Sequence, residues 1–250
     1  MNDLTVVVLT KNEEFNIISF LDNVKKVTNN VLVVDSGSSD NTVALAENHG
    51  CKVVYRKWDD DFSAQRNFAL KYVNTKWILY LDADERLDNK LMNNISKVIK
   101  SDERKQYEFY REVHAFGFKY KYGIFKPDKV IRMFQTNSVI WKNKIHERPE
   151  CNYPKCLLEG YIIHYTYKNW QHWLDKLGQY TTIWAEENFS KGKRICLIEV
   201  LLHGIYGFIS AYIVKRGFLD GWAGFFSSLQ HFLYTIIKYL KLYEIQNNQK

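Results

Sequence analysis

The sequence contains two aspartates one residue apart, Asp82 and Asp84, directly after the apolar run Trp77–Leu81. Just past the end of a strand, the backbone can turn two such carboxylates towards one cation. Carboxylate oxygens are hard ligands that suit Mg²⁺ or Mn²⁺, and these ions usually keep waters and share the phosphates of a substrate. Short acidic turns are also common after strands, so an Asx-turn or a cap for a helix beginning near Asp88 is the alternative. The pair therefore indicates a metal site only if other polar groups converge on it.

Polar residues also follow three other apolar runs, which are Thr5–Leu9, Val31–Val34 and Lys52–Tyr55. These polar segments are Thr10-Lys11-Asn12-Glu13, Asp35-Ser36-Gly37-Ser38 and Arg56-Lys57-Trp58. Asp35 has the position from which a carboxylate can accept hydrogen bonds from a base or ribose. Asn12 and Glu13 also fit the start of a helix, where acids are favoured by the helix dipole. Asp40, farther along the second turn, is more typical of a structural residue than of a ligand.

The four apolar runs are rich in β-branched and aromatic residues, which is typical of parallel strands buried on both faces. Helix-like stretches separate them, at about Glu13–Val27, Thr42–Asn48 and Ser63–Tyr72. Strands that alternate with helices predict an α/β fold with a doubly wound, mainly parallel sheet. Ligands bind such sheets at the carboxyl ends of the strands. We therefore expect the polar segments along one edge, with Arg66 on the third helix either joining them or solvated.

After Lys100 the pattern changes, and antiparallel additions to the sheet are expected. The segments with this pattern are Phe116–Phe125, Val130–Phe134 and Val139–Trp141. Helical periodicity returns at Trp170–Phe189 and again from Ile195 to the end. The segment Lys191-Gly192-Lys193-Arg194 predicts a boundary between a first domain at residues 1–190 and a helical, aromatic-rich C-terminal extension at residues 191–250.

The composition is that of an ordinary globular protein, and the net charge of +7 predicts an anionic partner. Nucleic acid, an acidic membrane surface and a phosphorylated substrate all fit that charge. The four cysteines form no Cys-x-x-Cys pair and predict free, buried thiols in a reducing compartment. Residues 1–3 run directly into a strand-like segment, so we expect no cleavable signal peptide and a cytoplasmic location.

Four segments resemble the inverting glycosyltransferases of family 2, which have the GT-A fold. They are VVVLTKNEE, VVDSGSSDNT, FSAQRNFAL and WILYLDADE, in the order and spacing of that family between residues 6 and 85. The nucleotide-sugar site that the resemblance implies contains Thr10, Asn12, Glu13, Asp35, Arg66 and Asp82. In it, Asp35 contacts the nucleobase, Asp82 faces the ribose and metal, and Asp84 ligates the metal. Residues 1–100 would bind the nucleotide sugar and residues 101–190 the acceptor.

The chemistry of such an enzyme accounts for these residues. A nucleoside-diphosphate leaving group gains negative charge as the glycosidic bond breaks, and a cation held by Asp84 would neutralise it. Inversion also needs a base on the opposite face of the sugar. Glu147 is our prediction for that base, because some members of the family have a similar His-Glu pair; an ion pair with Arg148 or a lysine is the alternative. His164 is predicted to contact the metal or diphosphate, or else to pack among tyrosines.

Eight basic residues and two acids lie between residues 119 and 148. The basic residues are Lys119, Lys121, Lys126, Lys129, Arg132, Lys142, Lys144 and Arg148. This excess fits a phosphorylated or carboxylated acceptor, with Lys142, Lys144 and Arg148 as candidate contacts, although a solvated face would show the same pattern.

The C-terminal stretch Gly221–Ile237 has no formal charge apart from His231. An apolar stripe at helical spacing contains Phe225, Leu229, Phe232, Ile236 and Leu240, with Phe226, Leu233 and Ile237 beside it. Polar residues such as Ser227, Ser228 and Thr235 lie elsewhere on the wheel, so the stretch predicts an amphipathic helix. Such a helix, flanked by basic residues, fits the anionic face of an inner membrane as a peripheral contact. Packing on the first domain or in a homodimer is the alternative.

The segment Lys215–Trp222, the His146-Glu147 pair and the stretch around Lys176 resemble bacterial β-1,4-glucosyltransferases that act on an inner-core heptose of lipopolysaccharide. The resemblance implies UDP-glucose as donor, although a different hexose or another cell-surface glycan would need only small changes in the pocket. A dehydrogenase would need a Gly-x-Gly-x-x-Gly turn after the first strand, which is missing. A nucleotidyltransferase would need a glycine-rich, basic loop at that turn. A nucleic-acid-binding module would leave the acidic strand ends unexplained, so we expect no nucleic acid partner.

Overall fold

The computed structural model describes residues 3–101, 103–144, 147–167 and 169–248. The chain divides into two compact units. The sheet unit contains Met1–Arg111 and Asp128–His164, and the helical unit contains Glu112–Pro127 and Tyr165–Lys250. The two units differ in charge, because the sheet unit has 22 Lys and Arg against 21 Asp and Glu, and the helical unit has 13 against 7. The predicted functional boundary at residue 190 is a different kind of division and stays a prediction.

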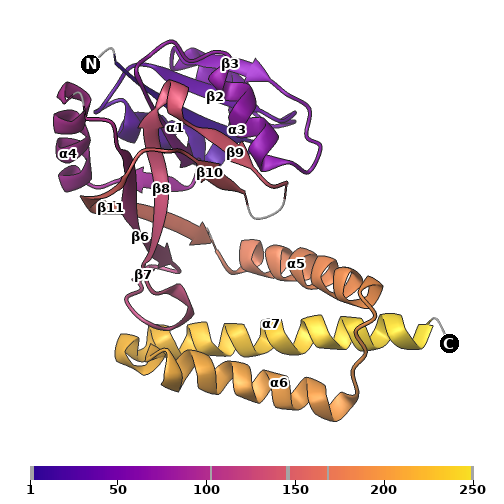
Figure 1. Cartoon of the computed structure of the whole chain (residues 1–250). Helices are drawn as coiled ribbons and strands as arrows, with labels where there is room; N and C mark the ends of the chain where they lie inside the picture. Colours follow the sequence, from indigo (N-terminus) through magenta and orange to yellow (C-terminus); the bar gives the residue numbers. More distant parts are fainter. Residues whose placement is uncertain (1–2, 102, 145–146, 168, 249–250) are drawn as a thin grey trace. The chain divides into compact units, whose positions relative to one another are not determined.

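The first part of the sheet unit alternates strands and helices as predicted (Figure 1). Its elements are β1 (Leu4–Thr10), α1 (Glu14–Val24), β2 (Val31–Asp35), α2 (Thr42–Asn48), β3 (Lys52–Tyr55), α3 (Phe62–Leu70) and β4 (Trp77–Asp82). The four strands are parallel and lie in the order β3-β2-β1-β4. The order reverses beside β1, which is the switch point at which such sheets bind ligands.

Antiparallel strands extend this sheet beyond β4. They are β5 (Glu85–Leu87), β6 (Gln106–Ala115), β8 (Asp128–Gln135) and β11 (Lys155–Tyr167), and the order continues as β4-β8-β6-β11-β5. A separate ribbon pairs β9 (Ile140–Lys142) with β10 (Arg148–Glu150). The strands predicted at residues 130–134 and 139–141 are therefore confirmed. Between β5 and β6, α4 (Asn89–Lys100) begins with an N-cap, because the side chain of Asp88 accepts the Leu91 N–H.

The strand predicted over residues 116–125 is wrong. Only β7 (Phe118–Lys119) pairs there, and a 3₁₀ turn at Gly123–Phe125 follows. Gly117 and Gly123 have φ of +80° and +69°, which breaks an extended chain. The carboxylate of Asp220 accepts the backbone N–H groups of Lys121 and Tyr122 at 3.0 and 2.8 Å, so these donors are not available to a strand partner.

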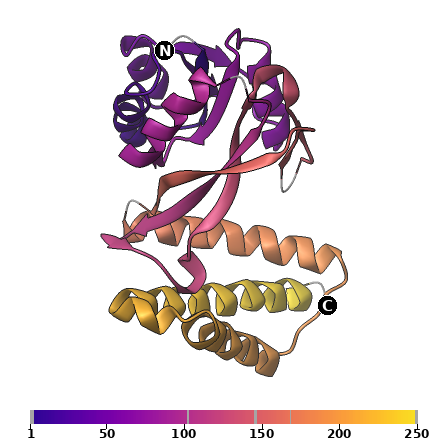
Figure 2. The same cartoon turned by 60° about the vertical axis from the view of Figure 1, so that its left-hand side comes forward.

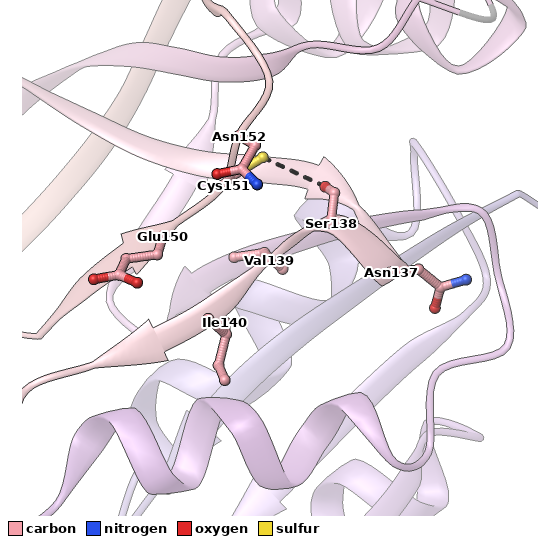
Figure 3. Close-up of a pocket in the computed structure, with 7 residues that line it drawn as sticks. All are labelled: Asn137, Ser138, Val139, Ile140, Glu150, Cys151 and Asn152. Atoms are coloured by element: carbon pink, nitrogen blue, oxygen red, sulfur yellow. Dashed lines mark hydrogen bonds between the residues drawn. The ribbon is translucent and has the colours of Figure 1, made fainter.

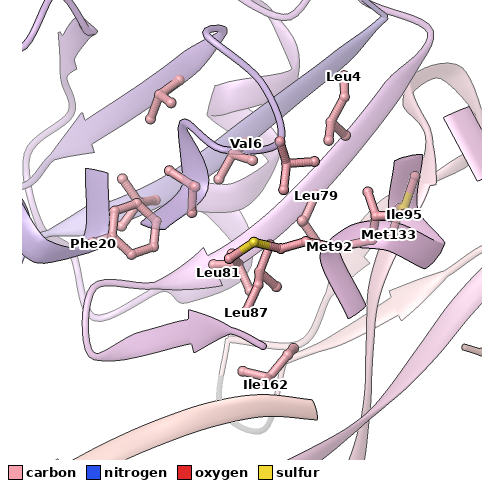
Figure 4. Close-up of a cluster of buried hydrophobic side chains, with 14 of the residues drawn as sticks. Leu4, Val6, Phe20, Leu79, Leu81, Leu87, Met92, Ile95, Met133 and Ile162 are labelled. Atoms are coloured by element: carbon pink, nitrogen blue, oxygen red, sulfur yellow. The ribbon is translucent and has the colours of Figure 1, made fainter. Parts of the chain in front are cut away.

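The apolar core covers both faces of the parallel strands. One cluster packs β1 and β4 against α1 and α4 (Figure 4), where Phe20, Leu79 and Ile95 are fully buried. A second cluster on the other face includes Tyr80 and Phe134. Replacement of a fully buried leucine such as Leu79 by alanine typically costs about 2–5 kcal/mol. The four cysteines are free, as predicted, but only Cys51 is buried.

The helical unit contains three long helices, α5 (Trp170–Ser190), α6 (Leu197–Ile209) and α7 (Gly221–Asn248). A π-helical turn at Ser210–Val214 prolongs α6, and a 3₁₀ turn at Gly217–Asp220 precedes α7. Helix α7 packs between α5 and α6 (Figure 2). Close contact with α6 depends on glycine, since a Cβ at Gly204 would overlap the Ile236 side chain. The stretch Leu197–Val214 is long and apolar enough to cross a membrane by length and composition, with mean hydropathy 1.8 and 22% of it buried.

Helix α7 is amphipathic as predicted, but its polar face is the one that is buried. Ser227, Ser228 and Thr235 are at most 6% exposed, whereas Leu229 and Leu240 are 37% and 42% exposed. The hydroxyls tolerate burial because each donates to a carbonyl of its own helix; Ser228, for example, donates to Gly224 O at 2.7 Å. Thr235 lies against Gly207 of α6, and Ser228 lies against Gly217 of the turn before α7.

Candidate active site at the carboxyl edge of the sheet

The parallel strands bring the predicted polar segments to one edge. Thr10 is paired in register with Asp35, and Leu9 with Asp82. The Thr10 hydroxyl donates to Asp35 Oδ2 at 3.0 Å. The other oxygen of Asp35 accepts the N–H groups of Gly37 and Ser38, both at 2.8 Å, so the turn after β2 holds this buried carboxylate in place. Gly37 has φ of +96°, which favours glycine in this tight turn.

The turn after β1 is joined to the turn after β2. Asn12, which has φ of +58°, accepts the Ser39 N–H on its side-chain oxygen at 2.8 Å. The Glu13 N–H donates to the Thr42 hydroxyl at 2.7 Å. Asp40 accepts hydrogen bonds from the Thr42 hydroxyl and the Glu14 N–H, as expected for a structural residue. These bonds make one rigid rim from two loops.

A pocket of about 210 Å³ opens at this rim, and its aromatic wall was not predicted. Its lining residues are Leu9, Thr10, Lys11, Glu13, Ser36, Trp58 and Phe62. The rings of Trp58 and Phe62 meet edge to face with centroids 4.6 Å apart. The sequence feature that could have predicted this wall was Trp58, shortly after the end of a predicted strand. Phe62 opens α3, where Asp61 provides the N-cap, so its place in the pocket depends on how that helix begins.

Asp82 lies between two arginines. Arg66 Nη2 is 3.1 Å from Asp82 Oδ1, and Arg132 Nη2 is 2.8 Å from Asp82 Oδ2. Although loss of contact with water raises the pKa of Asp82, the charges of Arg132 and Arg66 outweigh this and hold its pKa well below the usual range. Asp82 is therefore ionised at neutral pH.

A second carboxylate, Glu85, completes this network and was not predicted. It is fully buried, and its Oε1 lies 3.3 Å from Arg132 and 3.4 Å from Arg111. Burial raises the pKa of Glu85 despite these two positive charges. Arg132 was counted among the basic acceptor residues, but the structure buries it between Asp82 and Glu85. A buried cluster of paired charges with shifted pKa values is a candidate functional site.

Asp84 and His164 come together from distant parts of the chain. Pairing of β5 with β11 sets His164 opposite Glu85, and His164 Nε2 lies 3.2 Å from Asp84 Oδ2. Burial lowers the pKa of His164, but the hydrogen bond to Asp84 and the negative charges of Asp84 and Glu85 together outweigh burial, so its pKa is raised. Both side chains keep about a fifth of their surface exposed. Within the described residues, no three His, Cys, Asp or Glu side chains form a metal-binding group.

Glu147 reaches the same guanidinium group as Asp82. Its Oε1 lies 3.6 Å from Arg66 Nη2, and about a quarter of its side chain is exposed. The Arg66 guanidinium lies over the Trp141 ring, 4.7 Å from its centroid, which fixes the arginine between the two carboxylates. Glu147 thus forms an ion pair with Arg66. Its neighbour His146 is outside the described residues.

Comparison with known proteins identifies the family. Residues 5–148, more than half of the chain, match the profile of Glycosyl transferase family 2. The chain belongs to this family. A glycosyltransferase of Rickettsia typhi, described as uncharacterized, is 27% identical over 98% of this chain and 87% of the relative. The lipopolysaccharide core biosynthesis glycosyltransferase LpsC of Rhizobium meliloti is 23% identical over 96% of this chain and 92% of its own length.

A solved structure of similar fold is residues 1–349 of S. aureus TarS in complex with UDP-GlcNAc. It has a TM-score of 0.50 at 14% identity and covers 99% of this chain and 92% of that one. The predicted GT-A fold is confirmed, and the chain is a glycosyltransferase.

The basic residues predicted to hold the acceptor of this transferase have acidic neighbours. Lys142 Nζ is 2.7 Å from Glu150, and Arg148 is 3.7 Å from the same carboxylate. Lys144 is exposed on the segment between β9 and β10. Because each of the three side chains is at the surface, the acceptor role stays a prediction.

The transferase has another pocket, of about 290 Å³, between the turn after β8 and the start of the segment after β10 (Figure 3). Ser138 and Cys151 meet there, with Sγ 3.5 Å from Oγ. Gln135, just before this turn, pairs with Trp77 at the start of β4. The pocket is therefore at the opposite edge of the sheet from Asp82, and it does not belong to the site.

Proposed function

We propose that this glycosyltransferase moves a hexose, with glucose as the first choice, from a UDP-sugar to an anionic glycan acceptor with inversion of the anomeric centre. The observation that carries the proposal is that Asp82 and Glu147 flank one guanidinium, that of Arg66, while Asp84 meets His164 at the same edge. An inverting transfer needs stabilisation of the leaving group and removal of a proton. Asp84, paired with His164, would serve the first function, and Glu147 would serve the second.

The nucleoside would bind at the rim formed by the turns after β1 and β2. Trp58 and Phe62 provide flat apolar surface for the uracil, and stacking of this kind is worth about 1–3 kcal/mol per base. The nucleoside-binding residues in this proposal are Thr10, Asn12, Glu13 and Asp35, with Arg66 and Asp82 towards the ribose and diphosphate.

A divalent cation, Mg²⁺ or Mn²⁺, would bind at Asp84 with His164 as a second ligand. The pair offers one oxygen and one nitrogen donor that converge and stay partly exposed, which fits an ion whose other positions are filled by diphosphate and water. Asp82 remains a candidate ligand, because a carboxylate paired with two arginines still has lone pairs that can bind a cation. When bound, such a cation neutralises the negative charge that develops on the departing diphosphate.

Glu147 is the proposed base. The acceptor hydroxyl oxygen forms a bond to the anomeric carbon as the bond from that carbon to the UDP oxygen breaks, and the hydroxyl proton passes to Glu147. UDP leaves with the electron pair of the broken bond. Arg66 holds the Glu147 carboxylate in position to accept the proton.

The acceptor in this proposal is a phosphorylated or carboxylated glycan such as an inner-core heptose of lipopolysaccharide, contacted by Lys142, Lys144 and Arg148. LpsC, which resembles the chain over most of its length, is named for lipopolysaccharide core biosynthesis. Transfer would take place on the cytoplasmic side of the membrane. A different donor sugar or another cell-surface polysaccharide is the second candidate. Family membership favours a transferase over a nucleic-acid-binding module.

A donor panel tests the proposal. The purified chain is incubated with UDP-glucose, UDP-galactose, UDP-GlcNAc and GDP-mannose, with Mn²⁺, Mg²⁺ or EDTA, and release of free nucleotide is measured. We expect metal-dependent release that is fastest with UDP-glucose. Preference for another UDP-sugar would overturn the choice of glucose but not the UDP site, and preference for GDP-mannose would overturn both.

A further inference from the structure

The helical unit has a long apolar surface on α6 and α7. On one side of α6 and its extension, the exposed apolar side chains are Leu197, Ile198, Leu201, Leu202, Ile205, Ile209 and Ile213; Tyr206 and Val214 are exposed as well. On α7 they are Trp222, Phe226, Leu229, Leu233 and Leu240. Each set follows one side of its helix at intervals of three and four residues. We refer to the two sets together as the outer apolar face; a surface of this length is unusual for a protein in water.

The interior of the same helix pair contains small residues on α6. Gly204 faces Phe232 and Ile236 of α7, and Gly207 faces Thr235. Small residues at an interface let two helix backbones approach closely, which is typical of helices that pack in lipid. Many bulky apolar side chains of the pair remain outside this interface, where in water they would lose the benefit of burial.

A groove joins the two halves of the outer apolar face. Ile205 and Phe208 of α6 and Leu229 and Phe232 of α7 line an open space of about 240 Å³. Its lining is entirely hydrocarbon and aromatic, and it runs between neighbouring helices, so α6 and α7 present one continuous surface. An acyl chain is compatible with this apolar lining.

Basic residues lie at both ends of this face. Lys215 and Arg216 are in the turn between α6 and α7, and Lys191, Lys193 and Arg194 precede α6 at the other end. The helical unit as a whole has 13 Lys and Arg against 7 Asp and Glu. The apolar face is thus bordered at each end by positive charge that anionic headgroups would complement.

We propose that the outer apolar face docks the protein on an anionic membrane, with α6 and α7 lying flat in the lipid interface. A second copy of the chain fits less well. Since both ends are basic, either a parallel or an antiparallel pairing of two such faces would put positive ends together. Anionic lipid complements both ends at once.

The turn between α6 and α7 argues for a flat arrangement over a spanning one. Asp220 accepts the backbone N–H groups of Lys121 and Tyr122, and Gly123 donates to Lys215 O at 3.0 Å. These bonds tie the segment at residues 119–126 to the turn. Entry of the turn into the bilayer would therefore take Lys119, Lys121 and Lys126 with it, in addition to Lys215 and Arg216, and each such charge is costly there.

Vesicle binding by the purified full-length chain, without donor or acceptor, tests the proposal independently of catalysis. Binding is measured by flotation with vesicles of phosphatidylcholine alone or mixed with phosphatidylglycerol. We expect binding to the mixed vesicles only. Ile205→Glu and Leu229→Glu should each weaken it about tenfold or more, since an apolar contact with lipid is lost. The matched control is Ile140→Glu in the sheet unit, which replaces an equally exposed isoleucine (51% against 43%) and should bind like the unchanged chain.

Charge removal at the two ends tests the flat orientation. The double variants Lys215→Ser with Arg216→Ser, and Lys191→Ser with Arg194→Ser, should each weaken binding to the mixed vesicles by about fivefold per charge. Lys100→Ser with Lys155→Ser, at exposed positions of the sheet unit, is the control. If only one of the two double variants weakened vesicle binding, the flat arrangement would be overturned. In addition, vesicles with brominated acyl chains should quench tryptophan fluorescence of the unchanged chain. The quenched component should be missing in Trp222→Phe.

Two results would overturn membrane docking altogether. One is equal binding of the unchanged chain and Ile205→Glu to the mixed vesicles. The other is a dimer in sedimentation experiments that Ile205→Glu converts to a monomer while vesicle binding is absent or unaffected, because a second copy would then cover the face.

Discussion

The two units of the chain differ in how they treat bulky apolar side chains. In the sheet unit, aliphatic and aromatic residues fill both faces of the sheet, and the buried side chains of Arg66, Glu85 and Arg132 belong to one paired charge cluster. In the helical unit, Gly204 and Gly207 bring α6 close to α7, and many bulky apolar side chains of both helices are exposed. The sheet unit is nearly neutral, and the helical unit has most of the net positive charge.

If the outer apolar face docks on a membrane as proposed, the two units meet different surroundings. A water-exposed unit gains stability when it buries apolar area, and it accepts the cost of buried charge where chemistry needs it. A surface in contact with lipid gains nothing from that arrangement, because lipid tails are as apolar as leucine. Variants that affect one unit and leave the other unchanged therefore test this division of tasks.

The largest effect is expected for Glu147→Gln. Loss of the proposed base should lower kcat for transfer by about 10²- to 10⁴-fold, because the amide cannot take the acceptor proton. Binding of UDP, measured by calorimetry, and vesicle binding should be unchanged. Transfer at the unchanged rate would remove Glu147 as the base.

Asp84→Asn should lower metal-dependent turnover by about 10³-fold, since loss of several kcal/mol of transition-state stabilisation is expected when the cation is weakly held. Removal of metal from the unchanged chain with EDTA should have a similar effect, reversed by added Mn²⁺ or Mg²⁺. The circular dichroism spectrum and thermal unfolding are the controls for folding. Full activity of the variant, or of the EDTA-treated chain, would contradict the metal site.

In the helical unit, Gly204→Ala should destabilise the packing of α6 on α7 by about 1–3 kcal/mol, because the added methyl overlaps Ile236. Gly178→Ala in α5 is the matched control: a Cβ there meets no atom within 4 Å, and the change should be neutral or slightly stabilising. Thermal unfolding measures both. Equal melting temperatures would show that glycine at position 204 is not required for this contact.

A smaller effect is expected at the aromatic pocket. Trp58→Ala should raise KM for the UDP-sugar about tenfold and leave kcat nearly unchanged, because stacking on the base contributes to ground-state and transition-state binding alike. Trp170→Ala in the helical unit, where the ring is 52% exposed, should leave KM unchanged. A fall in kcat without a change in KM would assign Trp58 a different task.

Much of the sheet unit could be predicted because the pattern is local. Each apolar run is long enough to be a strand, and a polar turn follows it at the residue where the strand ends. The strand predicted over residues 116–125 failed because Asp220, about a hundred positions away, accepts the backbone N–H groups that a strand would need. The direction in which α7 faces was also not predictable, since periodicity identifies two faces of a helix without saying which one meets a neighbour.

The sequence by itself determined the order of strands and helices, the family resemblance, and the position of Asp35, Asp82 and Asp84 at the ends of strands. These features depend on residues close together in the chain. Only the tertiary structure decided which charges meet. It set Arg66 and Arg132 on either side of Asp82, His164 beside Asp84, and Glu147 on the guanidinium of Arg66. The physical reason is that Coulomb and hydrogen-bond energies depend on distances of a few ångströms between side chains, and strand pairing across 50–80 residues sets those distances.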